Sequence, residues 1–294
     1  MIDRPVSPPI AAESLRSAEL ADACCKRLAE CLTPSTQERV TNLVHCQCTL
    51  DQQVLGSTCL RIGFAHFPSV TRAITVGQLG TGGVPTALVL ARTNLLGGLG
   101  ATVVTAADKW MDPFERRYGD LVTFGDGAGA LFVDAHDETR AALAVVHGIT
   151  THLVPQGRPF WDRPIDSVAD EIIVNVTGAI GTALAQAGWT VDTTDLLVGE
   201  NYGCGIPERI AAIAGFADKC LLADRSDAHA SSSAFIDNLM RTLALSAEQN
   251  RSLRCAIWSA SLSGAIALTL VECDGRHATG DYRERLSVPA ATAS

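Results

Sequence analysis

Residues 74–88, ITVGQLGTGGVPTAL, place an apolar strand, a glycine-rich turn and the start of a helix in direct succession. A helix N-terminus lowers the pKa of a nucleophile there, because its free N–H groups and its dipole stabilise negative charge. The turn holds Gly80, Thr81 and Gly82, so the group that could react is the Thr81 hydroxyl. A threonine hydroxyl needs a neighbouring base, because its own pKa is far too high. The alternative is a tight turn in which this hydroxyl caps the helix.

The segments around this turn alternate between strand and helix patterns. Apolar stripes at helical spacing predict helices over residues 12–31, 84–96, 169–187, 209–217 and 231–245. Runs of apolar and β-branched residues predict strands over 40–50, 73–78, 101–108 and 195–200, and a final pair over 255–271. Strands that are apolar on both faces are typical of sheets covered by helices on both sides. The sequence therefore predicts an α/β layered fold in two similar halves.

The composition excludes several classes of protein. The 294 residues are 47% hydrophobic and carry a net charge of -9, which argues against nucleic acid as a partner because phosphate binding needs a basic face. No run reaches the roughly 18 to 20 apolar residues of a membrane span, and residues 1–12 lack the pattern of a secretion signal. We therefore expect a cytoplasmic protein without membrane contact. Its ten cysteines are expected to be free and non-catalytic, and their spacing fits no metal site.

The segment GDGAGALFV at 125–133 follows a predicted strand that ends at Ala107 and Asp108. It resembles the GDGAGA segment of the β-ketoacyl synthase III branch of the thiolase superfamily. Further segments fall in the same order as in that family: LVHCQCTLD (43–51), DLLVGENYG (195–203), HASSSAFIDNL (229–239) and AIWSASLSGAIALTL (256–270). We interpret the glycines of the GDGAGA segment as a tight structural turn.

The resemblance implies a thiolase-like five-layer αβαβα fold built from two pseudo-repeated halves, which we place at 1–150 and 151–294. It implies acyl transfer from coenzyme A or acyl carrier protein thioesters to an active-site cysteine, with no cofactor beyond the phosphopantetheine thioester that is the substrate. It also implies a homodimer, or a heterodimer with a related synthase. We expect the strand at 101–105 to form this dimer, because it is apolar on both sides.

The catalytic residues of that family are replaced in this sequence. The cysteine position falls on Gly80 or Thr81, the histidine position on Glu200 with Asn201 beside it, and the asparagine position on His229. The family geometry would bring Glu200 and His229 to one pocket, so that Thr81, His229 and Glu200 form a hydroxyl, a base and a group that orients the base. The alternative places Glu200 at a strand end in solvent and His229 as a helix cap. Five further positions are candidates for substrate binding: Gly80, Asn201, Ser231, Ser263 and Arg209.

The resulting hypothesis is a condensing-enzyme-like acyltransferase of specialised metabolism. A second hypothesis is a catalytically silent subunit that pairs with an active synthase of the same fold. A third is a hydrolase or decarboxylase that uses His229 and Glu200. The site separates these hypotheses, because an active enzyme needs a nucleophile and a base within reach of one another, and a silent subunit does not.

Overall fold

The computed structural model describes residues 16–49, 56–110, 115–136, 142–155, 157–222 and 228–277, which form two large mixed β-sheets and one small two-stranded sheet. The first sheet has the order β2 (Arg72–Gly77), β1 (Val40–Gln47), β3 (Ala101–Asp108) and β6 (Gly127–Val133). The second has the order β7 (Ala144–Leu153), β11 (Ala265–Cys273), β10 (Leu253–Ala260), β8 (Leu196–Val198) and β9 (Cys220–Leu221). In each large sheet three strands are parallel and the fourth, β6 or β11, is antiparallel to its neighbour.

The two halves repeat one topology. Read from its edge, the first sheet runs β2, β1, β3, β6, and the second runs β9, β8, β10, β11. After its edge strand, each half continues through a short 3-10 turn, η1 (Gly80–Gly82) or η3 (Ser231–Ser233), into a long helix, α4 (Gly83–Leu96) or α7 (Ala234–Gln249). Strand β7 adds a fifth strand to the second sheet and has no counterpart in the described part of the first. Because β7 contains residue 150, the second half begins by residue 144, slightly before the expected boundary.

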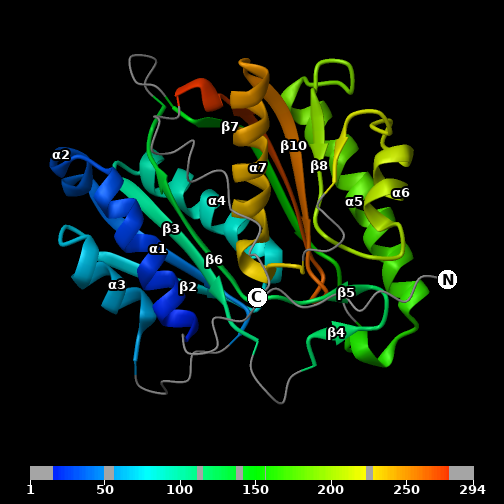
Figure 1. Cartoon of the computed structure of the whole chain (residues 1–294), viewed down its shortest axis with the longest axis horizontal. Helices are drawn as coiled ribbons and strands as arrows, with labels where there is room; N and C mark the ends of the chain where they lie inside the picture. The colour runs from blue at the N-terminus through cyan, green and yellow to red at the C-terminus, as the bar shows by residue number, and fades with distance from the viewer. Residues whose placement is uncertain are drawn as a thin grey trace, which may run out of the picture.

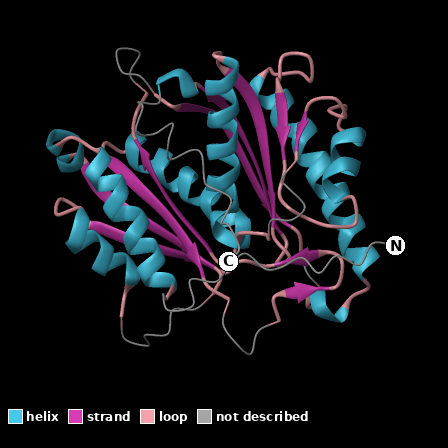
Figure 2. Cartoon of the chain, viewed as in Figure 1, coloured by secondary structure: helices cyan, strands magenta, loops and turns pink. Residues whose placement is uncertain are grey.

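Five layers follow from how the helices cover these sheets (Figure 1). Helices α4 and α7 lie between the sheets, α1 (Ser17–Cys31) and α3 (Thr58–His66) cover the outer face of the first, and α5 (Ile165–Ala187) and α6 (Ile206–Ile213) cover the outer face of the second. Figure 2 shows the same alternation of helical and sheet layers. The remaining elements are short: α2 (Pro34–Glu38), β4 (Arg117–Tyr118), β5 (Val122–Thr123), η2 (Phe160–Asp162) and η4 (Gly275–His277). The predicted thiolase-like αβαβα architecture is confirmed.

Strand β10 shows why the central strands lack a polar face. Its Cys255 and Ile257 side chains enter the core shared with α4 and α7. The intervening Ala256 and Trp258 enter the other core, with α5 and α6. Because successive side chains of a strand point to opposite faces, a strand between two helical layers buries both of its faces and carries mostly apolar residues.

The glycines of the GDGAGA segment do not form the predicted turn. Gly127 and Gly129 lie within β6, where they pair with β3. A Cβ on Gly129 would lie 2.8 Å from Ile236 at the start of α7, and one on Gly127 would lie 2.4 Å from Ser233 Oγ. These positions are glycine because the N-terminus of α7 packs directly on the strand, as is found where another element approaches a strand closely.

The expectation that residues 101–105 form the dimer is also wrong. These residues belong to β3, which pairs with β1 on one side and β6 on the other. All eight residues of β3 are buried within the chain. Their apolar character therefore reflects the two helical layers of one subunit. Among the described strands of the first sheet, the edges are β2 and β6.

Helix α3 and strand β7 were not predicted, and α5 extends further than predicted. By length and composition α5 could cross a membrane, but half of its apolar stretch is buried inside the protein. It packs on β10 and β11 and contributes Ile172, Val176 and Ile180 to the core of the second half. We therefore interpret α5 as a core helix.

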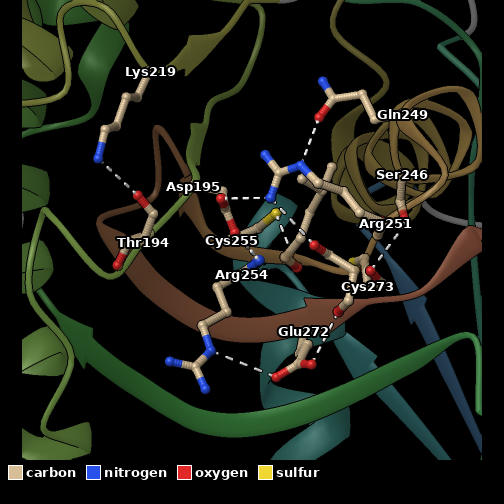
Figure 3. A network of polar contacts seen from close by, with 12 residues as sticks. Thr194, Asp195, Lys219, Ser246, Gln249, Arg251, Arg254, Cys255, Glu272 and Cys273 are labelled. Carbon is tan, nitrogen blue, oxygen red and sulfur yellow. Dashed lines mark hydrogen bonds and ion pairs between the residues drawn. The ribbon is translucent and has the colours of Figure 1, made fainter.

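A polar network fixes the second sheet at the end where β8 and β10 begin (Figure 3). Asp195 Oδ1 accepts from Arg251 Nη1 at 2.8 Å, and Asp195 Oδ2 accepts from the backbone N–H of Arg254 at 2.8 Å. Glu272 on β11 accepts from Ser252 Oγ at 2.9 Å and lies 3.6 Å from Arg254 Nε. The network ties the end of α7 to three strands.

Candidate active site

The candidate site lies where the two halves meet, at the ends of β3, β8 and β10. The turn η1 packs against η3 and against β10 and β11, while η3 packs against β3 and β6. The carboxyl ends of parallel strands in α/β sheets are where ligands usually bind. The pseudo-repeat therefore brings the two turns that precede the inner helices to one place.

Glu200 and His229 meet at this junction. Glu200 follows β8 and His229 precedes η3, and His229 Nε2 lies 3.2 Å from Glu200 Oε2. The two side chains are at most 2% exposed. The backbone of His229 forms a parallel bridge with Phe124, and this bridge fixes the backbone position from which the imidazole extends. The predicted proximity of this pair is confirmed, and its alternative, Glu200 in solvent, is wrong.

Both nitrogens of the His229 ring are engaged. The backbone N–H of Ser231 donates to Nδ1 at 3.1 Å, so Nδ1 carries no proton and the proton resides on Nε2. Nε2 then donates to Glu200 Oε2, which also accepts the backbone N–H of Ala260 at 3.3 Å. The ring caps the η3 turn and holds the carboxylate at the same time. It has no free nitrogen to accept a proton from Thr81, so the geometry does not support the base role expected for His229.

The second oxygen of Glu200 is the unusual group of the site. Oε1 is buried and has no hydrogen-bond partner among the described residues. Aromatic rings surround the pair, with Tyr202 at 4.9 Å and Phe124 at 5.6 Å between ring centroids from His229. A buried carboxylate oxygen without a donor is costly to stability. It is suited to accept a proton from a bound molecule.

The η1 turn does not form the predicted pair of a nucleophile and a base. The Thr81 side chain is 1% exposed, and within the described ranges its Oγ1 has no hydrogen-bond partner. The hydroxyl therefore does not cap α4, contrary to the alternative interpretation. Gly80 has φ +53°, and a Cβ there would lie 2.4 Å from Ser261 Oγ. The turn thus has no room for a side chain at Gly80.

The other candidate residues divide into two groups. Ser231 Oγ accepts from Trp110 Nε1 at 3.0 Å, and Ser263 Oγ donates to the Gln78 carbonyl oxygen at 3.1 Å, so both border the η1–η3 junction. Asn201 directly follows Glu200 and is half-buried. Arg209, by contrast, lies on α6 and pairs with Asp170 of α5 at 2.9 Å. It belongs to the outer helical layer, and the structure does not bring it to the site.

Comparisons with known proteins agree with this architecture. No family model matches the sequence, and no curated protein matches it. The chain superimposes on ChlB3, an acyltransferase, with a TM-score of 0.74, 17% identity and coverage of 90% of this chain and 86% of that one. AbyA1, a tetronic acid condensing enzyme, gives a TM-score of 0.71, 19% identity and 90% coverage of both chains. FabH from Pseudomonas aeruginosa PAO1, a 3-oxoacyl-(acyl carrier protein) synthase III, gives a TM-score of 0.71 and 16% identity, with coverage of 90% of this chain and 85% of that one.

The chain has the β-ketoacyl synthase III fold. Within this synthase III fold, sequence reasoning missed two residues beside the junction. Asp108, at the end of β3, accepts the backbone N–H groups of Cys48 and Thr49 through Oδ1, at 2.6 and 2.7 Å, and that of Ser232 through Oδ2, at 2.8 Å. Cys48 itself follows the end of β1. For Asp108 the sequence held a signal, because this residue is the single charge at the end of an otherwise uncharged, buried strand.

Proposed function

We propose that the protein is a condensing-enzyme-like acyltransferase that takes acyl groups from coenzyme A or acyl carrier protein thioesters, in the specialised metabolism of the cytoplasm. The observation that supports this most strongly is the buried Glu200 carboxylate, held by His229 at 3.2 Å and left with one oxygen unbonded among the described residues. A silent subunit would gain nothing from such a group, because an unpaired buried oxygen destabilises the fold.

The geometry supports roles for the pair that differ from those expected from sequence. Glu200 Oε1 acts as the general base, since it is the acceptor left open. His229 is a neutral hydrogen-bond donor that orients the carboxylate through Oε2. In this arrangement the base takes a proton from the attacking group, and the acyl carbon then passes from the thioester sulfur to that group.

The same base could instead activate water, which would make the protein a thioester hydrolase. Mass spectrometry of the products after incubation with acyl-coenzyme A and acyl carrier protein thioesters separates the two reactions. Acyl groups recovered on an added amine, alcohol or malonyl thioester indicate transfer. Recovery of the free acid alone, whatever acceptor is added, would contradict the proposed transferase.

Substitution of His229 tests its role as a donor. His229→Gln keeps a side-chain N–H that can reach Glu200, so we expect turnover to stay within about tenfold of the wild type. His229→Ala removes the donor and should cost on the order of a hundredfold, as for other hydrogen bonds that position charge in a site. Thiol release from acyl-coenzyme A measures both variants. Equal losses in both variants would instead indicate that the imidazole itself carries the proton.

We also propose a dimer that forms through β2, with either a second copy or a related synthase. Strand β2 is the edge of the first sheet opposite β6, and its Ile74 side chain is 46% exposed. The neighbouring α3 exposes Leu60 and Phe64. An exposed edge strand with apolar side chains is a template for pairing with another chain. A two-fold axis at this edge would join two sheets into one.

Sedimentation velocity at micromolar concentration should therefore show a dimer of the wild-type protein. Ile74→Lys should shift the equilibrium towards monomer by about tenfold or more, because it buries an unpaired charge in the interface. Val174→Lys provides the control, since Val174 is also exposed to solvent, at 69%, but lies on α5, on the far outer layer. A wild-type monomer, or a dimer unaffected by Ile74→Lys, would count against pairing through β2.

A further inference from the structure

Cys48 lies at the junction with its backbone fixed on both sides. Its N–H donates to Asp108 Oδ1 at 2.6 Å, and its carbonyl oxygen accepts from Gln78 Nε2 at 3.1 Å. Asp108 is fully buried and Gln78 precedes the η1 turn. The residue is therefore held between the end of β3 and the turn that lacks a usable nucleophile.

The sulfur of Cys48 is directed at both turns of the site. Ser232 Oγ of η3 lies 3.5 Å from Sγ, and the backbone N–H of Gly80, the first residue of η1, donates to the same sulfur. Gly80 has no side chain, and the space beside its Cα is filled by Ser261. Cys48, which directly follows β1, thus places its sulfur beside the η1 turn, where Gly80 supplies no reactive side chain.

Glu200 provides a second and independent observation at the same place. Its side chain is buried, and in the part of the chain that the structure describes its Oε1 has no hydrogen-bond partner. Ser232, whose Oγ lies 3.5 Å from Cys48 Sγ, directly follows Ser231, whose backbone N–H holds the His229 ring against Glu200. Burial, followed by the charges of Glu200 and Cys48, raises the pKa of the Tyr202 hydroxyl. The Cys48 thiol and the unpaired Glu200 oxygen therefore lie at the same junction.

We propose that Cys48 is the acyl acceptor of this site, with Glu200 as its base, an inference that rests on the proposed acyl transfer. Glu200 Oε1 takes the thiol proton while Cys48 Sγ attacks the carbonyl carbon of the thioester. The bond between that carbon and the coenzyme A or phosphopantetheine sulfur breaks, and the leaving sulfur receives the proton from Glu200. The products are an acyl-Cys48 thioester and a free thiol, so one thioester is exchanged for another.

The electrostatics of Cys48 explain why the base is required. Burial, followed by the charge of Asp108, raises the pKa of the Cys48 thiol to about 12, so the thiol is protonated at neutral pH. Only the thiolate is an effective nucleophile. The hydrogen bonds from Ser232 and from the Gly80 N–H act in the opposite direction and favour the thiolate. Attack therefore depends on proton removal at the moment of reaction.

Other cysteines do not fit this role. Cys46 is 1% exposed and lies in the core between the sheets. Cys204 is exposed and its thiol donates to the Asp120 carbonyl oxygen at 3.5 Å. Cys204→Ser is therefore a suitable control, because it removes a more accessible thiol outside the site.

Intact-mass spectrometry of the full chain, after incubation with acetyl- and longer acyl-coenzyme A and followed by peptide mapping, tests the proposal. We expect an acyl adduct on Cys48 that neutral hydroxylamine removes, as it does thioesters. Cys48→Ser and Cys48→Ala should lose this adduct and on the order of a hundredfold or more of turnover, while Cys204→Ser keeps both. Glu200→Gln should slow adduct formation without changing its location.

The outcomes separate this inference from the function on which it rests. Turnover that persists in Cys48→Ala, with no adduct on Cys48 in the wild type, would overturn the role of Cys48 and leave the acyltransferase function standing. An adduct on Cys48 without any turnover would support the thiol acceptor and remove the proposed transferase. Absence of both in the folded wild-type protein would overturn both. Thermal unfolding of the two Cys48 variants shows whether a lost adduct reflects chemistry or a lost fold, and a lost adduct in either folded variant supports the proposal.

Discussion

Glu200→Gln should lower acyl transfer by on the order of a hundred- to ten-thousandfold, the usual contribution of a general base. Glutamine has the shape of glutamate, so its carbonyl oxygen can still accept from His229 and from the Ala260 N–H, as Glu200 Oε2 does. The amide nitrogen would take the place of Oε1, and an amide nitrogen accepts no proton. The variant therefore removes the chemistry and preserves the packing. Thiol release from acyl-coenzyme A at saturating substrate measures the loss.

Glu272→Gln is the matched control. Glu272 is also a glutamate on the second sheet, but it lies in the network at the start of β10, beside Arg254 and Ser252 (Figure 3). The candidate site lies at the opposite end of β10, beside Ala260. We expect the control to retain wild-type turnover. If Glu200→Gln and Glu272→Gln behave alike, Glu200 is not the base.

Trp258→Ala should destabilise the protein by about 3 to 5 kcal/mol, the range for truncating a buried aromatic residue. Trp258 on β10 is fully buried, and its ring lies against Gly199, where a Cβ would come within 2.6 Å of Nε1. Its indole N–H has no partner among the residues that the structure describes, so truncation leaves no polar group stranded. The loss then arises from the cavity and from lost apolar contact.

Equilibrium unfolding in urea measures this effect, with Trp161→Ala as the control. Trp161 is 64% exposed, so its truncation should change the free energy of unfolding by no more than about 0.5 kcal/mol. A loss of stability below about 1 kcal/mol for Trp258→Ala would contradict this prediction, because it would show that the core of the second half closes around the missing ring.

Much of the architecture could be predicted from sequence because its strands carry an unambiguous pattern. Residues 101–108 are buried at every position, and such a run in an α/β sequence indicates a strand between two helical layers. The same run misled the prediction of the dimer, because a strand buried by its own subunit looks the same in sequence as one buried by a partner. The glycines of the GDGAGA segment were misjudged for a similar reason. Glycine marks a close approach of backbones as well as a turn.

The site could be predicted only in part. The order of segments brought Glu200 and His229 together correctly, because topology fixes where strand ends and turns meet. The state of the His229 ring depends on a single backbone N–H, that of Ser231, which has φ +48°. No sequence pattern encodes which ring nitrogen that group reaches. Cys48 was missed because the prediction followed the position of the nucleophile along the chain, whereas a neighbouring strand can supply a side chain to the same point in space.

The central claim is that this junction catalyses acyl transfer by itself. The most direct measurement is thiol release from a panel of acyl-coenzyme A and acyl carrier protein thioesters by the purified wild-type protein, without any partner synthase. We predict release of many equivalents of thiol per protein chain, which Glu200→Gln largely abolishes. No release beyond the uncatalysed rate with any thioester, together with activity that appears only when an active synthase is added and is unaffected by Glu200→Gln, would contradict the claim and identify a silent subunit.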